Sequence, residues 1–594
     1  MHRAARVAWP ALTFLVAIVS ALVVTTALAG GADGLLVARV AALIVLDLAT
    51  GAVLGILAAV LLVLPLDDAR RERLLDVAAG AAAIWTAAAA TTMFLLYLGA
   101  APAVSDPAFG SGIVTFVADV AIGRTWLLSA VGAAVLTAAL LAVRSPAGIA
   151  VLAAAAVLAV IPEALQGPST GDPLATARSI AGADLVQLTG TGAWIGLTVL
   201  AVALDAPPAV RRRVCALSVV IGIAVVGATV LRAPLESGDG VPTAALLLPV
   251  IALVCALGVA VAGSRTPSRG LLRVALLLLA GVSGFTSGTA VGRRAPLQPA
   301  ARSTPAEILT GSALPAPMSP GRLALDLRPD AVWLVVGAAL LGAYVAGVVV
   351  LRRRGGTWPT GRVASWIVGL VLLGWLTSGG IAVYQEVLLS TRLVQHAALL
   401  LPVPLLLAGG APLQLLRRVG PGSDGVGSIR AGLLAVARAP LVAVVTRPVP
   451  AAVIAVVVVG AVDGTGLLRW SLTDPVGAEA VVALCLVAGA LVVASCVSGD
   501  ASRRVAVTVA VVLLVVEAAG AAVLALGSGL LLASWYGAMG WGTDALADQR
   551  AGASAAGVIL LVSTGVLLLA AARKAPRGAA RPRPVAPIQE EVPA

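Results

Sequence analysis

Three side chains that can form hydrogen bonds or ligate a metal lie close together in one apolar stretch of the chain. They are Arg392, Gln395 and His396, in a segment that spans 384–418 and ends in a pair of arginines. Arg392 and His396 are four residues apart, so on a helix they project from the same face. Ionisable groups at membrane depth usually face the interior of a helix bundle or a wet cavity, which makes this face a candidate site. The alternative is that both groups lie near the membrane surface and extend their polar ends into water.

Acidic residues in or beside other apolar runs indicate that the interior of the protein is polar. Three glutamates of the second half are candidate partners for a buried arginine: Glu386, Glu479 and Glu517. The polar intramembrane site that we predict consists of Arg392, Gln395, His396, Glu386 and Glu517. The first half carries Asp47, Glu163 and Asp184 in similar positions. These charges indicate either a path for protons or ions, or charge pairing that fixes helix packing.

The composition predicts which elements must position these groups. The 594 residues are 60% hydrophobic and only 11% charged, with a mean hydropathy of +1.05. Apolar runs of about 20 residues recur from end to end, which is typical of a polytopic membrane protein and excludes a soluble domain. The net charge of +12 is almost entirely arginine in short loops between runs, which favours the positive-inside pattern over nucleic-acid binding. The four cysteines form no CxxC motif, so neither a disulfide framework nor a zinc site is indicated.

We therefore predict an all-α fold, a polytopic transmembrane helical bundle of about sixteen spans in two halves. The arginine bias places both termini in the cytoplasm, with nine spans in the first half and seven in the second. The predicted spans are 8–29, 38–65, 76–99, 125–143, 147–165, 183–204, 214–232, 243–263, 271–292, 331–351, 363–383, 393–416, 449–467, 476–497, 505–527 and 552–572.

Between the two halves lies a proline-rich segment that reads as an external loop. The predicted units are a membrane domain at 1–292, the linker loop at 293–329, a second membrane domain at 330–573 and a disordered cytoplasmic tail at 574–594. The segment 101–112 is also polar and rich in turn residues, so it is predicted to be an external loop.

The second half resembles the CtaG family, membrane factors for cytochrome c oxidase assembly. Members look like S-x-H-M-x-Q-H-M-L-L, followed by a proline-containing run and G-A-P-L-x-L-L-R. The matching residues here are Ser390, Gln395, His396, Leu399, Leu400, Pro402, Gly410, Ala411, Pro412, Leu413 and Arg417. Further along, Asp548 and Gln549 match an external D-Q-x-x-G motif of the family. From the residues alone this pair could equally be a helix cap and turn.

The first half resembles the copper-resistance D (CopD) family. The resemblance is carried by EALQGPSTGD at 163–172 and DLVQLTGTGAWIGL at 184–197. The segment TPAEILTGSALPAP at 304–317 looks like the loop that joins the two units in fused actinobacterial CopD/CtaG proteins. The resemblance implies copper handling linked to oxidase maturation.

Most histidines that the resemblance would assign to copper are absent. The expected positions hold Arg392, Ala478, Leu484 and Glu517 in the second half, and Pro168 and Gln187 in the first. Copper(I) prefers thiolate, thioether or imidazole ligands, and an arginine offers no lone pair. Its charge at 4 Å would also disfavour a bound cation by about 4 kcal/mol at an effective dielectric constant near 20. His396 is thus the one candidate metal ligand, and its alternative role is a hydrogen bond to Arg392, Gln395 or a neighbouring helix.

The sequence predicts a multi-pass plasma-membrane protein in contact with the lipid bilayer, with weakened or lost copper binding. Its partners by resemblance are cytochrome c oxidase subunits or other membrane proteins, and no nucleic acid. Two alternatives stay open: a transporter of a non-metal solute, and a structural partner of a respiratory or envelope complex. The chain carries no phosphate-binding loop, zinc-protease motif or nucleophile elbow, so we do not expect an enzyme.

Overall fold

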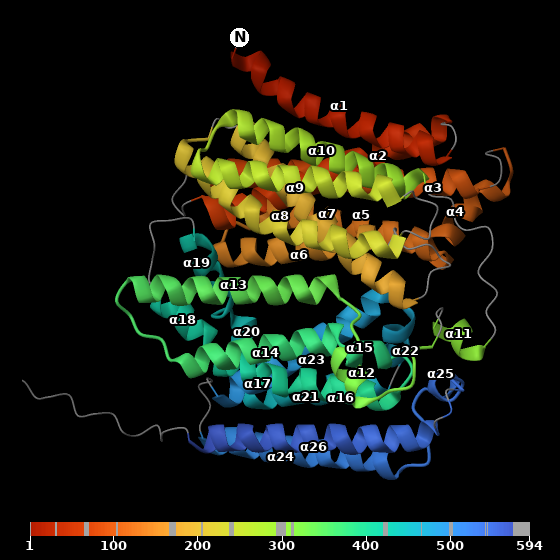
Figure 1. Ribbon diagram of the computed structural model, residues 1–594, viewed down its shortest axis with the longest axis vertical. Helices are drawn as coiled ribbons and strands as arrows, with labels where there is room; N and C mark the ends of the chain where they lie inside the picture. Colours follow the sequence, from red (N-terminus) through yellow and green to blue (C-terminus); the bar gives the residue numbers. More distant parts are fainter. Residues whose placement is uncertain are drawn as a thin grey trace, which may run out of the picture.

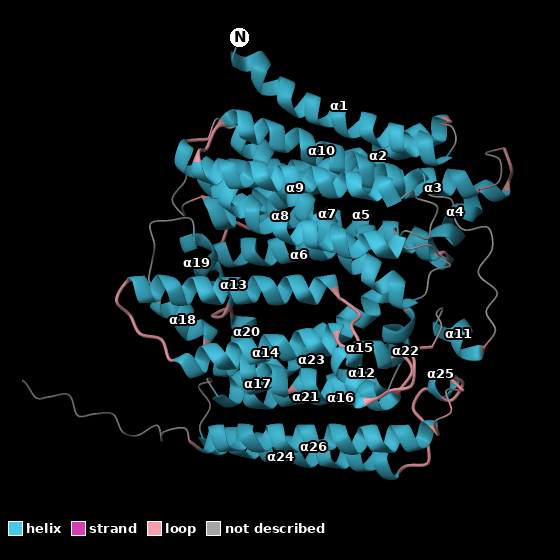
Figure 2. Cartoon of the chain, viewed as in Figure 1, coloured by secondary structure: helices cyan, strands magenta, loops and turns pink. Residues whose placement is uncertain are grey.

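The computed structural model is a stack of helices that run roughly side by side (Figure 1). It describes residues 2–573 apart from 30–32, 65–69, 102–104, 165–173, 204–205, 237–242, 293–303, 311–313, 420–425, 465, 498–502, 541 and 543. The described residues form helices and loops and contain no strand (Figure 2). A helix satisfies its own backbone hydrogen bonds, which is why long apolar segments adopt this structure in lipid.

The described residues of the first half form nine long helices, one short helix and a π-helical turn. Their bounds are α1 (His2–Ala29), α2 (Gly34–Ala58), η1 (Ala59–Val63), α3 (Arg70–Ala100), α4 (Ala108–Asp119), α5 (Ala121–Ala142), α6 (Pro146–Ala164), α7 (Leu174–Ala203), α8 (Pro208–Glu236), α9 (Thr243–Arg265) and α10 (Arg269–Gly292). Helix α2 packs against both α3 and α7 in the middle of this half, and α1 packs along α10 at its edge (Figure 1). The segment 101–112 is not entirely a loop as predicted, because α4 begins at Ala108.

Glycines allow α2 and α7 to approach closely. A Cβ added to Gly55 would lie 2.5 Å from the Cα of Gly196, and one added to Gly51 would lie 2.8 Å from the carbonyl oxygen of Gly192. Helices in lipid associate through such close backbone packing, because burial of apolar area drives them together much less than in water. This contact fixes the position of the central helix of the first half.

Replacing Gly55 by alanine is expected to destabilise the protein by about 1–3 kcal/mol, because the backbone of α7 cannot move away cheaply. Thermal unfolding of the purified protein in detergent measures the effect. Gly80 on α3 is the matched control, since a Cβ there meets nothing within 4 Å. An equal response of the two alanine variants would contradict the close contact.

The second half contains three kinds of helix: long spans, pieces of broken spans and short connecting helices. Their bounds are α13 (Ala331–Arg353), α14 (Thr360–Ser378), α15 (Gly380–Tyr384), α16 (Leu389–Leu400), α17 (Pro402–Gly409), α18 (Pro412–Arg418), α19 (Val426–Val436), α20 (Pro440–Val445), α21 (Pro448–Gly464), α22 (Gly466–Thr473), α23 (Pro475–Val497), α24 (Arg503–Leu526), α25 (Ala533–Tyr536) and α26 (Ala545–Ala572). Helices α24 and α26 pair along the outer edge of this half (Figure 1).

The span predicted at 393–416 is broken into three helices. Leu401 leaves helical geometry before Pro402, and Ala411 adopts a left-handed conformation (φ 51°) before Pro412. Proline disfavours helical geometry in the preceding residue and lacks a backbone N–H, which explains both breaks. The span predicted at 449–467 is likewise bent, by 66° between α21 and α22.

The segment predicted to be a linker loop is partly helical and packs on the second half. It contains α11 (Pro305–Thr310) and α12 (Pro320–Leu325). Tyr384 donates a hydrogen bond to the carbonyl of Ala316 at 2.9 Å. A Cβ on Gly380 would lie 2.6 Å from the Cα of Leu323, so α12 and α15 are in backbone contact. The proline content that suggested a loop instead starts the two short helices, since proline is well suited to the first helical turn.

The number of spans agrees with the sequence prediction. Fifteen helices in the described part of the chain are long and apolar enough to cross a membrane, or sixteen if the α21–α22 pair counts as one. Nine of them precede the linker segment. The halves meet where α13 packs on α7 and α19 packs on α6. The tail predicted at 574–594 lies outside the described residues, as does most of the EALQGPSTGD motif.

Candidate functional site

Helix α16 occupies the interior of the second half and carries three of the site residues predicted from the sequence. Arg392, Gln395 and His396 are 2%, 1% and 6% exposed, so none of them extends to a membrane surface. The helix packs against α26 and α23. A Cβ on Gly552 of α26 would collide with the Cα of Ser390, which shows how closely these two helices approach.

His396 forms its principal contact with an aspartate that the sequence analysis overlooked. Its Nδ1 lies 2.8 Å from Oδ1 of Asp463, near the end of α21. When Nδ1 carries the proton, it donates to this carboxylate and leaves Nε2 with a free lone pair. Nε2 is buried and has no hydrogen-bond partner among the residues that the structure describes. The ring is thus held in place by a neighbouring helix, one of the alternatives that the sequence left open.

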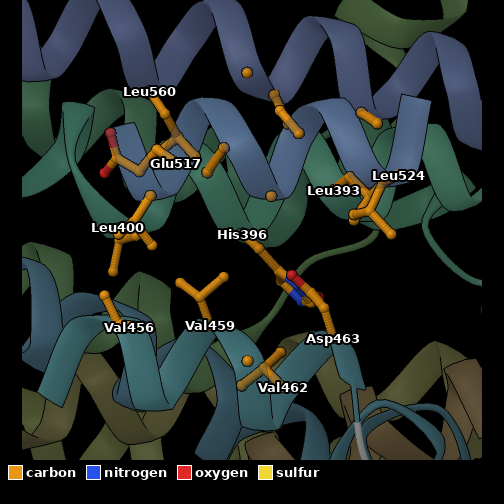
Figure 3. A pocket seen from close by; sticks show the side chains of 18 of the residues that line it. Leu393, His396, Leu400, Val456, Val459, Val462, Asp463, Glu517, Leu524 and Leu560 are labelled. Carbon is orange, nitrogen blue, oxygen red and sulfur yellow. The ribbon is translucent and has the colours of Figure 1, made fainter. Parts of the chain in front are cut away.

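The same pair lines a largely apolar cavity of about 390 Å³. Figure 3 shows the side chains of His396 and Asp463 pointing toward each other, with Glu517 apart from them. Glu517 on α24 accepts a hydrogen bond from Thr564 at 2.7 Å, and within the described chain its Oε1 has no hydrogen-bond partner. Cys485 of α23 also lines this cavity. Leucines, valines and alanines form most of the remaining wall, so the polar groups are isolated in an apolar surround.

Arg392 points to different partners from His396, although both lie on one face of α16. Its guanidinium donates to Oε1 of Gln385 at 2.6 Å and to the hydroxyl of Ser471 on α22. The three glutamates that were candidate partners have contacts of their own. Glu479 accepts from the indole of Trp333 at 2.5 Å, Glu517 bonds to Thr564, and Glu386 pairs with Arg328.

Glu386 belongs to a separate cluster at the start of α16. Its carboxylate lies 2.9 Å from Nη1 of Arg328, which comes from the segment before α13. Trp535 donates to the backbone carbonyl of Glu386 at 2.8 Å, and Tyr536 donates to that of Gln385 at 3.0 Å. Burial raises the pKa of Tyr536, so its hydroxyl keeps the proton that it donates. These bonds fix the turn from which α16 begins.

Asp548 and Gln549 lie in the first turns of α26 and connect it to its neighbours. The carboxylate of Asp548 accepts from the backbone N–H of Ser390 at 3.0 Å, so it caps α16 from another helix. Gln549 accepts from the N–H of Leu531 at 2.7 Å and donates to the carbonyl of Gly529 at 2.9 Å. The cap of α26 itself is Asp544. The pair therefore brings the two family-like motifs of the second half into direct contact.

The predicted site is thus divided. His396 and Glu517 line one cavity, whereas Arg392 contacts Gln385 and Ser471. Gln395 donates to the carbonyl of Leu376 at 2.7 Å. Glu386 faces Arg328. Asp463, Cys485 and Arg328 were not among the site residues predicted from the sequence. Asp463 could have been found as a carboxylate within a predicted span, whereas nothing in the sequence pairs Cys485 with His396.

Comparison with known proteins finds a family match in the second half of the chain. Residues 342–577 match the model of the cytochrome c oxidase caa3 assembly factor family (Caa3_CtaG). A protein of Mycobacterium bovis described as uncharacterized is 33% identical over 115 residues, which cover 19% of this chain and 17% of that protein. A Mycobacterium leprae protein described in the same way is 34% identical over 125 residues, 21% of this chain and 19% of the relative. No solved structure matches.

The fold and the match together define a class. The protein is a many-spanning membrane protein whose C-terminal half is related to oxidase assembly factors. The resemblance of the first half to the CopD family has no counterpart in these comparisons and stays a hypothesis.

Proposed function

We propose that the protein acts in the plasma membrane as an assembly partner of a cytochrome c oxidase-type complex, through protein contacts rather than as a copper donor or an enzyme. The observation that carries this proposal is the match of residues 342–577 to the assembly factor family. The Asp548–Ser390 bond supports it, because it joins the two family-like motifs. In this proposal both termini face the cytoplasm, in keeping with the arginine-rich loops.

The donor groups around His396 fit copper(I) poorly. The cavity offers one imidazole nitrogen and the thiol of Cys485, which are suitable ligand types. However, no group of three His, Cys, Asp or Glu residues in the described chain is arranged to hold a metal. Arg392 places a buried positive charge one helical turn away. These features support the hypothesis that copper binding is weak or lost.

His396→Ala is expected to leave assembly function intact. In a strain that lacks the gene, wild-type protein and the variant should both restore oxidase activity, and both should co-purify with oxidase subunits. A variant that co-purifies but restores activity only when excess copper is supplied would contradict the proposal. If the wild-type protein did not co-purify with oxidase subunits, the oxidase would be excluded as its partner.

A further inference from the structure

A second cavity lies within the first half and shares no lining residue with the cavity around His396. Its volume is about 170 Å³, several times the ~30 Å³ that a water molecule occupies in the liquid. Asp47, Glu163 and Gln187 also line a smaller adjoining cavity. The walls come from α2, α3, α5, α6, α7, α8 and α10. Unlike the apolar cavity of the second half, this one is lined by charges of both signs.

Two of its carboxylates are held by neutral donors alone. Oδ2 of Asp47 accepts from Ser287 at 2.6 Å and from Ser283 at 3.1 Å. Oε1 of Glu163, a residue 7% exposed, accepts from the indole of Trp85 at 2.7 Å and from Ser129 at 3.2 Å. Within the described chain, neither carboxylate forms an ion pair. A charge in this environment is costly unless it is paired, so a bound cationic group would be stabilised here.

The same cavity also contains groups that need a hydrogen-bond acceptor or a negative charge. Arg39 lines it and forms no hydrogen bond or ion pair with any residue that the structure describes; the carboxylate of Asp33, which caps α2, acts on its charge only from a distance. The indole of Trp126, which is 3% exposed, has an Nε1–H that finds no acceptor among the described residues. Buried donors are nearly always paired, so this one points to an acceptor supplied by a ligand. Arg232, by contrast, is already engaged by Asp184 at 2.5 Å.

These groups distinguish between classes of ligand. A simple cation would compensate Asp47 and Glu163 but leave Arg39 and Trp126 without an acceptor. A simple anion would do the reverse. A small molecule with both charges satisfies all four groups at once. A metal ion is not favoured, because no three ligand-type residues of the described chain are suitably arranged.

We propose that this cavity binds a small zwitterion, an α-amino acid, with its ammonium group at Asp47 and Glu163 and its carboxylate at Arg39 and Trp126. Thr50 and Thr191 line the adjoining cavity, and their buried hydroxyls have no hydrogen-bond partner in the part of the chain that the structure describes. They provide further hydrogen bonds for a polar side chain. This proposal concerns the first half alone and is independent of the role in oxidase assembly.

Binding of a panel of radiolabelled α-amino acids to the full-length protein in detergent tests the proposal. At least one is expected to bind saturably. Its amide, which keeps only the positive charge, and its N-acetyl derivative, which keeps only the negative charge, should each bind at least about tenfold more weakly, since each loses a charged contact. Binding of no amino acid, or equal binding of either derivative, would overturn the proposal and, in the second case, identify a simple cation or anion site.

Substitutions then assign the two ends of the ligand. Arg39→Gln and Asp47→Asn should each weaken binding at least about tenfold, because each removes a charge-assisted hydrogen bond. Asp76→Asn is the control, because Asp76 is 61% exposed and pairs with Arg144 outside the cavity. The His396→Ala variant should bind the amino acid as the wild type does, because His396 lies outside this cavity. Unchanged binding by the Arg39 and Asp47 variants would contradict this assignment of the ligand's ends. If either variant fails to fold, the comparison of the amino acid with its amide and N-acetyl derivative on wild-type protein still tests the proposal.

Discussion

Replacing Arg328 by methionine is expected to destabilise the second half by about 3 kcal/mol, near the lower end of what breaking a buried ion pair costs. Glu386 is 5% exposed and would keep a buried charge without its 2.9 Å partner. The Arg328 side chain is 22% exposed, which is why the lower end of the range applies. Unfolding of the purified protein in mixed micelles with a denaturing detergent measures the effect.

The double variant Arg328→Met, Glu386→Met separates pairing from packing. It should recover most of the lost stability, because no unpaired charge stays buried. Arg322→Met is the matched control, since its contact with Asp326 is longer (3.7 Å) and its side chain is 49% exposed. Equal destabilisation by the double and single variants would contradict an unpaired buried charge on Glu386 as the cause of the lost stability.

Replacing Arg392 by methionine is expected to destabilise the protein by about 2–6 kcal/mol, because two buried acceptors lose their donor at about 1–3 kcal/mol each. These acceptors are Gln385, which is 1% exposed, and Ser471, which is 4% exposed. The free energy of unfolding is again the measured quantity.

The triple variant with Gln385→Met and Ser471→Ala should be more stable than Arg392→Met alone, because the acceptors are removed with the donor. Arg392→Lys is the charge-conserving comparison; a single ammonium cannot reproduce the planar fork that reaches both partners, so it should recover little. If the lysine variant were as stable as the wild type, the hydrogen bonds of the guanidinium to Gln385 and Ser471 would not be the reason that Arg392 stabilises the protein.

The sequence was sufficient to predict the membrane spans but not the points at which some of them are broken. Continuous apolar runs predict helices because lipid leaves the backbone no other partners, and the division into nine and seven follows from the runs. The breaks at Leu401 and Ala411 each come directly before a proline, but the apolar run continues through both, so hydropathy alone predicts one unbroken span. The two short helices of the linker segment were missed because its proline content suggested a loop, and the contact of α12 with α15 is not visible in the sequence.

The candidate site could be predicted only in part. Spacing placed Arg392 and His396 on one face of a helix, and burial of both agrees with that face being internal. Gln385 lies only 7 residues before Arg392, but Asp463 and Ser471 lie 67 and 79 residues further along the chain than their partners, and a single sequence does not show which distant residues pair. Arg392 and His396 therefore share a face but not a site, because Asp463 and Ser471 approach from different helices.

The central claim is that the second half retains an assembly-factor fold without functioning as a copper site. Copper(I) titration of the detergent-purified protein, with bound metal quantified per chain and His396→Ala and Cys485→Ser measured alongside, tests it most directly. We expect wild-type protein to hold far less than one copper per chain, with no change in either variant. One copper per chain in the wild type that is lost in both variants would show that His396 and Cys485 form a working site and would contradict the account.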